Sequence, residues 1–387
     1  MIVINKSLDT SVAGEKAKGC FEDIKNRYEL FANFDDVALL TQDSQDFSQA
    51  FSRIDHVPCS FSRSKTVGGL LARSAYLRWS YFVLKSFLWL VRHRRNIKIL
   101  ISENVDSPAP FVVSVLFGIP YVVYSRYDVG QQVKWINKRS VVGILILMEE
   151  KFVFKRVEKL WVTSPHLTSM ARSFGRRKQT TLIPNWISYA DTTHAAGSHR
   201  SDLAEGFRIL FVGRLHPVKR VDLIIQALSI LERRIPCVDL YLVGDGEEKD
   251  RIGKLVDSLD LTKRVHFLGY KERSAVFELM MNSNVLVLCS KIEGNPRVLI
   301  EAMMCKIPIV ATNVSGIRDM VQHKKTGYLV SNDPEPEELA SAVECMLKDK
   351  ELSRTIVNGA YEFARNNFSE ESALRKIRND LCELLQR

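Results

Sequence analysis

The stretch VLVLCSKIEGNPRVLIEAMMCKIPIVATNVSG, residues 285–316, decides the fold of this chain. Its first residues, Val285–Leu288, predict a buried strand, and a second strand is expected at Pro308–Ala311. Between them, Asn295 is expected to cap a helix that has Pro296 at its first position. A strand, a helix and a strand in this order are typical of a parallel sheet that is crossed by helices.

Two carboxylates bracket the start of this predicted helix. Glu293 lies in the loop before the helix and Glu301 lies nearly two turns inside it, so the two side chains do not stack on one face. The layout suits hydrogen bonds to hydroxyls at the two ends of an extended ligand, with phosphates between them at the helix N-terminus. Carboxylates for acid and base work would instead flank one bond closely. The alternative is a loop charge at Glu293 and a solvated helix residue at Glu301.

A second stretch, ILFVGRLHPVKRVDLIIQAL, residues 209–228, places basic residues after another predicted strand. Arg214 and Lys219 lie in the loop before a helix whose apolar residues recur at helical spacing. Ligands of parallel α/β sheets collect beyond the carboxyl ends of the strands, and a helix start suits phosphate. Basic residues in this loop are therefore expected to meet the anions of a ligand. The alternative is a solvated surface loop.

Short β-branched runs alternate with helical patterns along the whole chain, which predicts parallel sheets in both halves. The strands expected in the first half are Ile2–Ile4, Val37–Leu40, Ile97–Ser102, Tyr121–Ser125 and Leu160–Thr163; those expected in the second half are Arg208–Val212, Asp239–Val243, Val265–Leu268, Val285–Leu288, Pro308–Ala311 and Tyr328–Val330. The 387 residues exceed the usual size of a single core. A small and polar stretch, residues 188–206, is where we expect the domain boundary.

Composition and charge exclude several classes of protein. The seven cysteines are scattered and contain no C-x-x-C pair, so neither a disulfide framework nor a zinc site is expected. No apolar run is long enough to span a bilayer, and the N-terminus lacks the features of a secretory signal. The net charge is uneven: residues 1–190 hold 27 Lys and Arg against 16 Asp and Glu, and residues 191–387 hold 28 against 29. A cytoplasmic protein with a basic first half is expected.

Four motifs in the second half of the chain occur in an order that is typical of a known family. FVGRLHPVKR, LYLVGDG and VHFLGY precede the pattern Glu293–x7–Glu301, and together they make residues 208–330 resemble the retaining GT-B glycosyltransferases of family 4, also called glycosyl transferases group 1. The resemblance implies an α/β fold of two Rossmann-like domains whose parallel sheets face across a cleft. It places an acceptor-side domain at residues 1–190, a nucleotide-sugar domain at residues 191–370, and a C-terminal helix at residues 371–387 that packs back on the first domain.

The resemblance also implies roles for residues that match the motifs. Arg214 and Lys219 match the basic pair that contacts the diphosphate of the donor and balances the charge on the leaving group, so no metal or other cofactor is expected. Glu293 matches the glutamate that approaches the donor sugar, and Glu301 the one that binds the ribose. Catalytic roles are thus expected for Glu293, Arg214 and Lys219. Further donor contacts are expected from Gly244, Gly246, Gly269, Tyr270, Gly294, Asn295 and Pro296.

The sequence departs from the family pattern at several positions. Arg220 and Lys306 stand where glycine is common, and Cys289 stands where proline is common. The segment SRYDVG, residues 125–130, occupies the place of a His-Asp pair whose histidine contacts the donor sugar, and Arg126 or Asp128 is a candidate substitute. A glycine-rich loop after the first strand is reduced to Gly14, so the acceptor side is expected to be remodelled.

The densest charge feature of the chain is a basic and aromatic segment. Residues 61–100 contain nine Lys or Arg and no Asp or Glu, and aromatic residues are interleaved with them in residues 67–95. This pattern predicts a helix that lies on an anionic membrane, which would suit a lipid-linked acceptor and a peripheral position on the inner face of the cell membrane. The alternative is a core helix with one solvated face. The residues assigned to the membrane surface are Arg73, Arg78, Trp79, Lys85, Trp89, Arg92, Arg94 and Arg95.

These observations favour an enzyme that moves a hexosyl group from a nucleotide-diphosphate sugar to an acceptor hydroxyl with retention. The expected acceptor is a glycan, lipid-linked or part of the cell envelope, and a phosphate of the donor is expected to act as the base. One alternative is a Rossmann-type oxidoreductase, although no G-x-G-x-x-G follows the first strand. Another is a non-catalytic basic module that binds membranes. Nucleic acid is not an expected partner, because no nucleic-acid-binding signature accompanies the charge.

Overall fold

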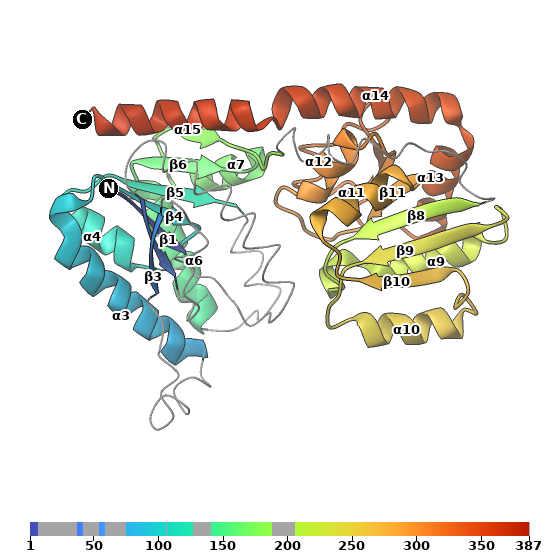
Figure 1. Ribbon diagram of the computed structural model, residues 1–387, viewed down its shortest axis with the longest axis horizontal. Helices are drawn as coiled ribbons and strands as arrows, with labels where there is room; N and C mark the ends of the chain where they lie inside the picture. Colours follow the sequence, from blue (N-terminus) through green and yellow to red (C-terminus); the bar gives the residue numbers. More distant parts are fainter. Residues whose placement is uncertain are drawn as a thin grey trace. The chain divides into compact units, whose positions relative to one another are not determined.

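The protein is described by a computed structural model that divides into two compact units (Figure 1). The structure describes residues 1–6, 37–41, 54–58, 75–105, 107–126, 141–187 and 206–386. The first unit comprises Met1–Ile183 with Leu374–Arg387, and the second comprises Pro184–Ala373. The predicted boundary at residue 190 lies outside the described residues.

The first unit is built on a parallel sheet of seven strands in the order β3-β2-β1-β4-β5-β6-β7. The strands are β1 (Ile2–Lys6), β2 (Val37–Thr41), β3 (Ile54–Pro58), β4 (Ile99–Glu103), β5 (Tyr121–Ser125), β6 (Lys159–Val162) and β7 (Thr180–Leu182). Every residue of β4 and β5 is buried, as expected for strands that helices cover on both faces. The two edge strands, β3 and β7, are absent from the sequence-based prediction because both carry polar residues and β7 has only three residues.

Helices cover this sheet through apolar faces. They are α3 (Ala75–His93), followed by the 3-10 turn η2 (Arg94–Asn96), α4 (Ala109–Phe117), α6 (Val141–Arg156) and α7 (Pro165–Ser173). On α3, Phe82, Ser86 and Leu90 recur at every fourth position and are buried. None of the described helices is long and apolar enough to cross a lipid bilayer.

The C-terminal helix α15 (Glu370–Leu385) contributes its residues from Leu374 onward to the first unit. Asp380 on this helix accepts three hydrogen bonds from the sheet: from Lys159 Nζ at 3.0 Å, from Trp161 Nε1 at 2.7 Å and from Thr181 Oγ1 at 2.6 Å. Lys376 Nζ donates to the Leu182 carbonyl at 3.0 Å. A carboxylate thus joins the last helix to strands β6 and β7.

The second unit has a parallel sheet of six strands in the order β10-β9-β8-β11-β12-β13. The strands are β8 (Phe207–Val212), β9 (Val238–Val243), β10 (Val265–Gly269), β11 (Val285–Leu288), β12 (Ile309–Thr312) and β13 (Tyr328–Val330). From β8 the chain first builds the sheet toward β10 and then returns to place β11 on the other side of β8. The order of strands therefore reverses between β8 and β11, where parallel sheets open a crevice for ligands. The predicted fold class, α/β with two parallel sheets, is confirmed.

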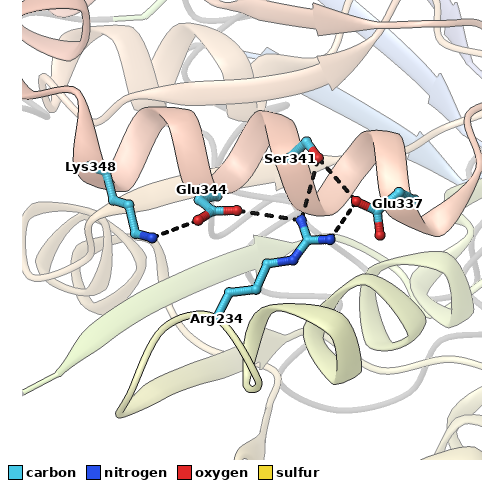
Figure 2. A network of polar contacts seen from close by, with 5 residues as sticks. All are labelled: Arg234, Glu337, Ser341, Glu344 and Lys348. Carbon is cyan, nitrogen blue, oxygen red and sulfur yellow. Dashed lines mark hydrogen bonds and ion pairs between the residues drawn. The ribbon is translucent and has the colours of Figure 1, made fainter.

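Seven helical segments accompany the second sheet. They are η3 (Pro217–Lys219), α9 (Val221–Leu231), α10 (Lys249–Ser258), α11 (Arg273–Met281), α12 (Arg297–Met304), α13 (Pro336–Lys348) and α14 (Lys350–Asn367). Figure 2 shows a polar network in which Arg234, after α9, reaches Glu337, Ser341 and Glu344 of α13, while Lys348 binds Glu344. These groups are largely at the surface, so water screens them and the network orients the two helices more than it stabilises the unit.

Candidate functional site

An ion pair lies at the point where the strand order of the second sheet reverses. Lys219 Nζ, in the loop after β8, donates to Glu293 Oε1, in the loop after β11, at 2.5 Å. Ser290 Oγ donates to the same oxygen at 2.5 Å. The side chains of Lys219 and Glu293 are 23% and 10% exposed, so both keep some access to solvent. A cation and a carboxylate thus lie side by side where the strand order reverses.

Arg220 holds the loop that carries Lys219 in place through hydrogen bonds. Its backbone has φ +49°, a left-handed conformation that glycine adopts most easily, which explains why glycine is common at this position of the family. The arginine here is buried, and its guanidinium donates to the Cys289 carbonyl at 2.8 Å, to the Asn332 carbonyl at 3.0 Å and to the Asp333 carboxylate. These three acceptors compensate for the backbone conformation and tie the loop to the end of β11.

Two further departures from the family pattern, Lys306 and Cys289, lie at the ends of α12 and β11. Lys306 adopts φ +54° just after α12, and its Nζ lies 4.4 Å from the centre of the Tyr361 ring. Cys289 is fully buried, and burial raises the pKa of its thiol to about 12. The thiol therefore stays protonated at neutral pH and does not serve as a nucleophile.

Helix α12 begins one residue later than the sequence predicts. Pro296, with ψ 113°, is the N-cap, and the first helical residue is Arg297, so the expected capping role of Asn295 is wrong. The Asn295 side chain instead accepts a hydrogen bond from the Asn185 backbone N–H at 2.7 Å, and the Asn295 carbonyl accepts one from Asn185 Nδ2 at 2.5 Å. Both residues are buried. Asn185 therefore holds the loop before α12, although it lies 110 residues away in the chain and no local pattern marks it.

Gly316 supports the same loop from the segment after β12. It has φ +85°, and a Cβ atom built on it would lie 2.3 Å from the Glu293 carbonyl oxygen and 2.5 Å from that of Gly294. Nearby, Thr312 Oγ1 donates to the Ser290 carbonyl at 2.7 Å. The backbone at Glu293 is thus packed directly against residue 316, where only hydrogen fits.

The resemblance implies that Glu293 contacts the donor sugar. Replacing Gly316 by alanine should then displace Glu293 and lower kcat/KM for the donor by about tenfold to a hundredfold, since misplacements near 1 Å can cost that much. Steady-state kinetics with a nucleotide sugar measure the change. The matched control is Gly253→Ala in α10, where an added Cβ meets nothing within 4 Å. Equal activity of the two variants would show that the Gly316 contact does not hold the site.

Two glycines let the loops after β8 and β9 touch through their backbones. A Cβ on Gly244 would lie 1.9 Å from the Gly213 carbonyl oxygen, and a Cβ on Gly246 would lie 2.2 Å from that of Leu215. The Gly244 N–H donates to the Gly269 carbonyl at 2.8 Å, which adds the end of β10 to this edge. The structure therefore brings Gly244, Gly246 and Gly269 together, and Tyr270 directly follows the last of them.

Arg214 lies on the same sheet edge but in a different ion pair. Its Nη2 atom lies 3.1 Å from Glu247 Oε2, in the loop after β9, and its side chain is 68% exposed. His216 Nε2 lies 3.3 Å from the other oxygen of Glu247. A hydrogen bond to its own backbone, with smaller effects of Arg214 and His216, lowers the pKa of Glu247. The predicted basic pair is therefore divided: Lys219 binds Glu293, and Arg214 binds Glu247.

Glu301 is largely enclosed and is not a solvated helix residue. Its side chain, on α12, is 15% exposed, and Oε1 lies 3.7 Å from Nε of Arg273, the first residue of α11. Helix α11 follows β10. Glu301 therefore faces the part of the unit that carries Gly269 and Tyr270.

In the first unit, Arg126 follows β5 and is held at the carboxyl edge of the sheet. Its N–H donates to Asn104 Oδ1 at 2.9 Å, and its Nη1 lies 3.6 Å from the buried Glu103 Oε2. Thr163 Oγ1 donates to the Arg126 carbonyl at 2.9 Å. The other acceptor-side candidates, Gly14 and Asp128, lie outside the described residues.

The residues predicted for a membrane surface are only partly described. Arg73 lies outside the described residues, as do the side chains of Arg78 and Trp79 on α3. The described members occupy two environments: Lys85, Arg92 and Arg95 are exposed, whereas Trp89 and Arg94 are half-buried. The ring of Trp89 packs against the core and stacks on His93 at 4.2 Å, and Arg94 lies 5.1 Å from the Phe117 ring.

Comparisons with known proteins agree with this architecture. Residues 200–363 match the family described as Glycosyl transferases group 1. N-acetyl-alpha-D-glucosaminyl L-malate synthase of Bacillus anthracis is 33% identical over 73% of this chain and 76% of its own length. Alpha-D-kanosaminyltransferase of Streptomyces kanamyceticus is 27% identical over 74% of this chain and 79% of its own length.

Solved structures share the fold. Sucrose-phosphate synthase from Thermosynechococcus elongatus superposes with a TM-score of 0.75 at 22% identity and covers 100% of both chains. Anabaena HepE in complex with UDP-glucose has a TM-score of 0.72 at 20% identity, over 98% of this chain and 99% of its own. Because the Bacillus anthracis synthase is 33% identical over 73% of this chain, the chain belongs to the glycosyl transferases group 1, which are retaining glycosyltransferases of the GT-B fold that use nucleotide-sugar donors.

Proposed function

We propose that this enzyme transfers a hexosyl group from a nucleoside-diphosphate sugar to an acceptor hydroxyl, and that it holds the donor at the carboxyl edge of the second sheet. The observation that carries the proposal is the contact between Lys219 and Glu293 at the reversal of strand order. A nucleotide sugar carries an anionic phosphate directly beside a hydroxyl-rich ring. A cation beside a carboxylate matches those two neighbouring groups.

In this proposal the cations of the site bind the phosphates of the donor, and the carboxylates bind its hydroxyls. Lys219 and the first backbone amides of α12 bind the diphosphate and stabilise the negative charge that develops as it leaves. Arg214, which is exposed and paired with Glu247, turns toward the same phosphates when the donor binds. Glu293 accepts hydrogen bonds from the sugar hydroxyls and fixes the orientation of the ring, and Glu301 accepts from the ribose.

The loops that surround these side chains form the rest of the donor site. Gly244, Gly246 and Gly269 bring three loop backbones close to the nucleotide, and Tyr270 extends that wall. Gly294, Asn295 and Pro296 run along the sugar and phosphates. The direct contact between Asn295 and Asn185 supports this role, because it holds the loop before a ligand arrives.

The bond between the anomeric carbon and the diphosphate breaks, and the acceptor oxygen bonds to that carbon on the same face. The departing nucleoside diphosphate takes the proton of the acceptor hydroxyl on its phosphate. Two cationic side chains supply charge that a metal ion supplies in other transferases, and we therefore propose that the reaction needs no metal. Among the described residues no group of three or more His, Cys, Asp or Glu side chains is placed to hold a metal ion.

For the acceptor we propose a glycan of the cell envelope, free or linked to lipid, that the enzyme meets on the inner face of the membrane. Two relatives support this class by name: poly(ribitol-phosphate) alpha-N-acetylglucosaminyltransferase of Staphylococcus aureus, 28% identical over 43% of this chain, and the lipopolysaccharide core biosynthesis glycosyltransferase LpsE of Rhizobium meliloti, 24% identical over 57%. Arg126, held by Glu103 and Asn104, is the residue that we propose at the acceptor side.

Nucleoside diphosphates should raise the melting temperature of the protein in EDTA, because a ligand that binds only the native state stabilises it by about 2.7 kcal/mol at a hundred times its Kd. Thermal denaturation with UDP, GDP and NAD measures the effect. Lys219→Ala should reduce the shift, whereas Lys348→Ala, a surface substitution on α13, should leave it unchanged. A shift with NAD and none with UDP or GDP would contradict the proposal, and a shift that requires added metal would contradict metal independence.

A further inference from the structure

Exposed apolar side chains are concentrated on one part of the first unit. The large hydrophobic residues that are exposed among the described residues are Leu84, Leu88, Val112, Val115, Leu116, Phe117, Met148, Phe152 and Leu385. All but Leu385 belong to α3, α4 and α6, and none belongs to the second unit. Contiguous exposed apolar groups on a water-exposed surface usually mark a place where something binds.

Helix α4 is the centre of this surface. It contains no charged residue, and one side is buried through Ala109, Pro110 and Val113. The other side exposes Val112 by 39% and, three and four residues later, Val115 by 64% and Leu116 by 61%. A helix that is apolar all round is normally buried on every side, so the exposure of this one is unusual.

Helix α3 lies beside α4 and adds charge to the apolar groups (Figure 1). The stripe of α3 that faces away from the core carries Leu84, Lys85, Leu88 and Arg92, and Arg95 follows in η2. All five side chains are exposed. We refer to the exposed hydrophobic residues of α3 and α4 (Leu84, Leu88, Val112, Val115, Leu116 and Phe117) as the apolar surface.

The cations around the apolar surface have no acidic counterpart on α3. Residues 61–100 contain nine Lys or Arg and no Asp or Glu, and Arg94 lies against Phe117 where α3 and α4 meet. A second copy of the chain packed symmetrically on this surface would bring Lys85, Arg92 and Arg95 against cations of its partner, and like charges disfavour such contacts. A lipid bilayer with anionic headgroups offers apolar chains to the hydrophobic residues and negative charge to the cations.

Helix α6 lies at the flank of the apolar surface and adds an exposed hydrophobic residue, Phe152, beside it. Phe152 contacts Phe111 of α4, with ring centres 5.5 Å apart, and Lys151, Lys155 and Arg156 are exposed near it. Of the two acidic residues on this helix, Glu150 is buried. Burial raises the pKa of Glu149 to about 7, so about half of its carboxyl groups are neutral near that pH.

We propose that the apolar surface of α3 and α4 inserts into the headgroup region of an anionic bilayer, with Lys85, Arg92 and Arg95 on the lipid phosphates. This deepens the membrane position included in the proposed function, and it differs from adsorption by charge alone because the uncharged helix α4 makes the central contact. The binding energy then comes from buried apolar side chains as well as from headgroup charge. The residues involved all lie in the first unit, so the proposal does not depend on the chemistry of the donor site.

Co-sedimentation with vesicles tests the insertion. The full-length protein should bind vesicles that contain phosphatidylglycerol and bind pure phosphatidylcholine vesicles much more weakly. The double variant Val115→Asp with Leu116→Asp should lower the partition coefficient by about tenfold or more, because charge replaces inserted apolar groups. The matched control is Leu385→Asp, which places a charge at an exposed hydrophobic residue of α15, outside the surface, and should bind as the wild type does.

Neutralising the cations gives a second and independent readout. Lys85→Gln, Arg92→Gln and Arg95→Gln together should lower binding to anionic vesicles by about tenfold to a hundredfold and remove most of its salt dependence. Thermal unfolding and the shift caused by UDP or GDP, measured on each variant, show that the fold and the donor site are intact. If UDP and GDP do not shift the melting temperature of the wild type, the donor proposal is rejected and the membrane proposal is unaffected.

Three outcomes would overturn the proposal. The first is a wild-type protein that does not bind anionic vesicles. The second is equal binding by the wild type and the Val115→Asp, Leu116→Asp variant, which would leave only adsorption by charge. The third is a dimer in light scattering that this double variant converts to a monomer, without vesicle binding by either form, which would identify a second copy of the chain as the partner.

Discussion

Glu293→Gln is expected to lower kcat by about a hundredfold to a thousandfold, as does the loss of other groups that stabilise or orient a transition state directly. The amide keeps the shape of the side chain but loses the charge that binds Lys219. It also loses the strong acceptor that we propose for the sugar hydroxyls. Both side chains are partly exposed, so water can solvate the remaining ammonium group and the melting temperature should change little. Initial rates at saturating donor measure the effect.

Lys219→Ala completes the test of the ion pair. Each single substitution is expected to remove most of the activity, and the double variant should be little worse than either, because the proposed function has both residues act on the same bound donor. Glu351→Gln, an exposed glutamate of α14, is the matched control and should retain the wild-type rate. Rates of Glu293→Gln and Lys219→Ala equal to that of the control would remove this pair from the site.

Asp380→Ala is expected to destabilise the first unit by about 3 kcal/mol, since it leaves several buried or half-buried donors without an acceptor. Trp161, whose side chain is fully buried, loses the partner of its indole N–H, and Lys159 and Thr181 lose the same carboxylate. For a unit of about 200 residues this corresponds to a fall of about 6–12 °C in its melting temperature. Differential scanning calorimetry measures the transition.

The control for Asp380 lies on the same helix. Glu383 also binds Lys159, at 2.6 Å, but its side chain is 48% exposed, so Glu383→Ala should cost less than about 1 kcal/mol. The shift in melting temperature caused by UDP or GDP should survive in both variants, because the residues that we propose for the donor belong to the second unit. Equal destabilisation by the two substitutions would contradict the anchoring role of Asp380.

Much of the second unit could be predicted from local pattern. Buried strands of a parallel sheet are short apolar runs, and turns with glycine or proline separate them from amphipathic helices, so the predicted run Arg208–Val212 differs from β8 by one residue. The edge strands β3 and β7 were missed because strands at an edge need fewer apolar residues. The first helical residue of α12 was misplaced because local propensity places Asn295 as a cap, whereas a distant partner, Asn185, binds it instead.

Neighbouring residues are enough to predict the alternation of strands and helices, the loops that carry Lys219 and Glu293, and the concentration of cations in residues 61–100. The folded arrangement is needed to see that β8 and β11 lie side by side, which brings Lys219 to Glu293 across 74 positions of the chain. It also decided that Gly316 packs on the backbone of Glu293 and that α4 exposes an apolar face. Contacts of this kind depend on how the sheet closes and on which surfaces remain uncovered, and no short segment of sequence encodes either.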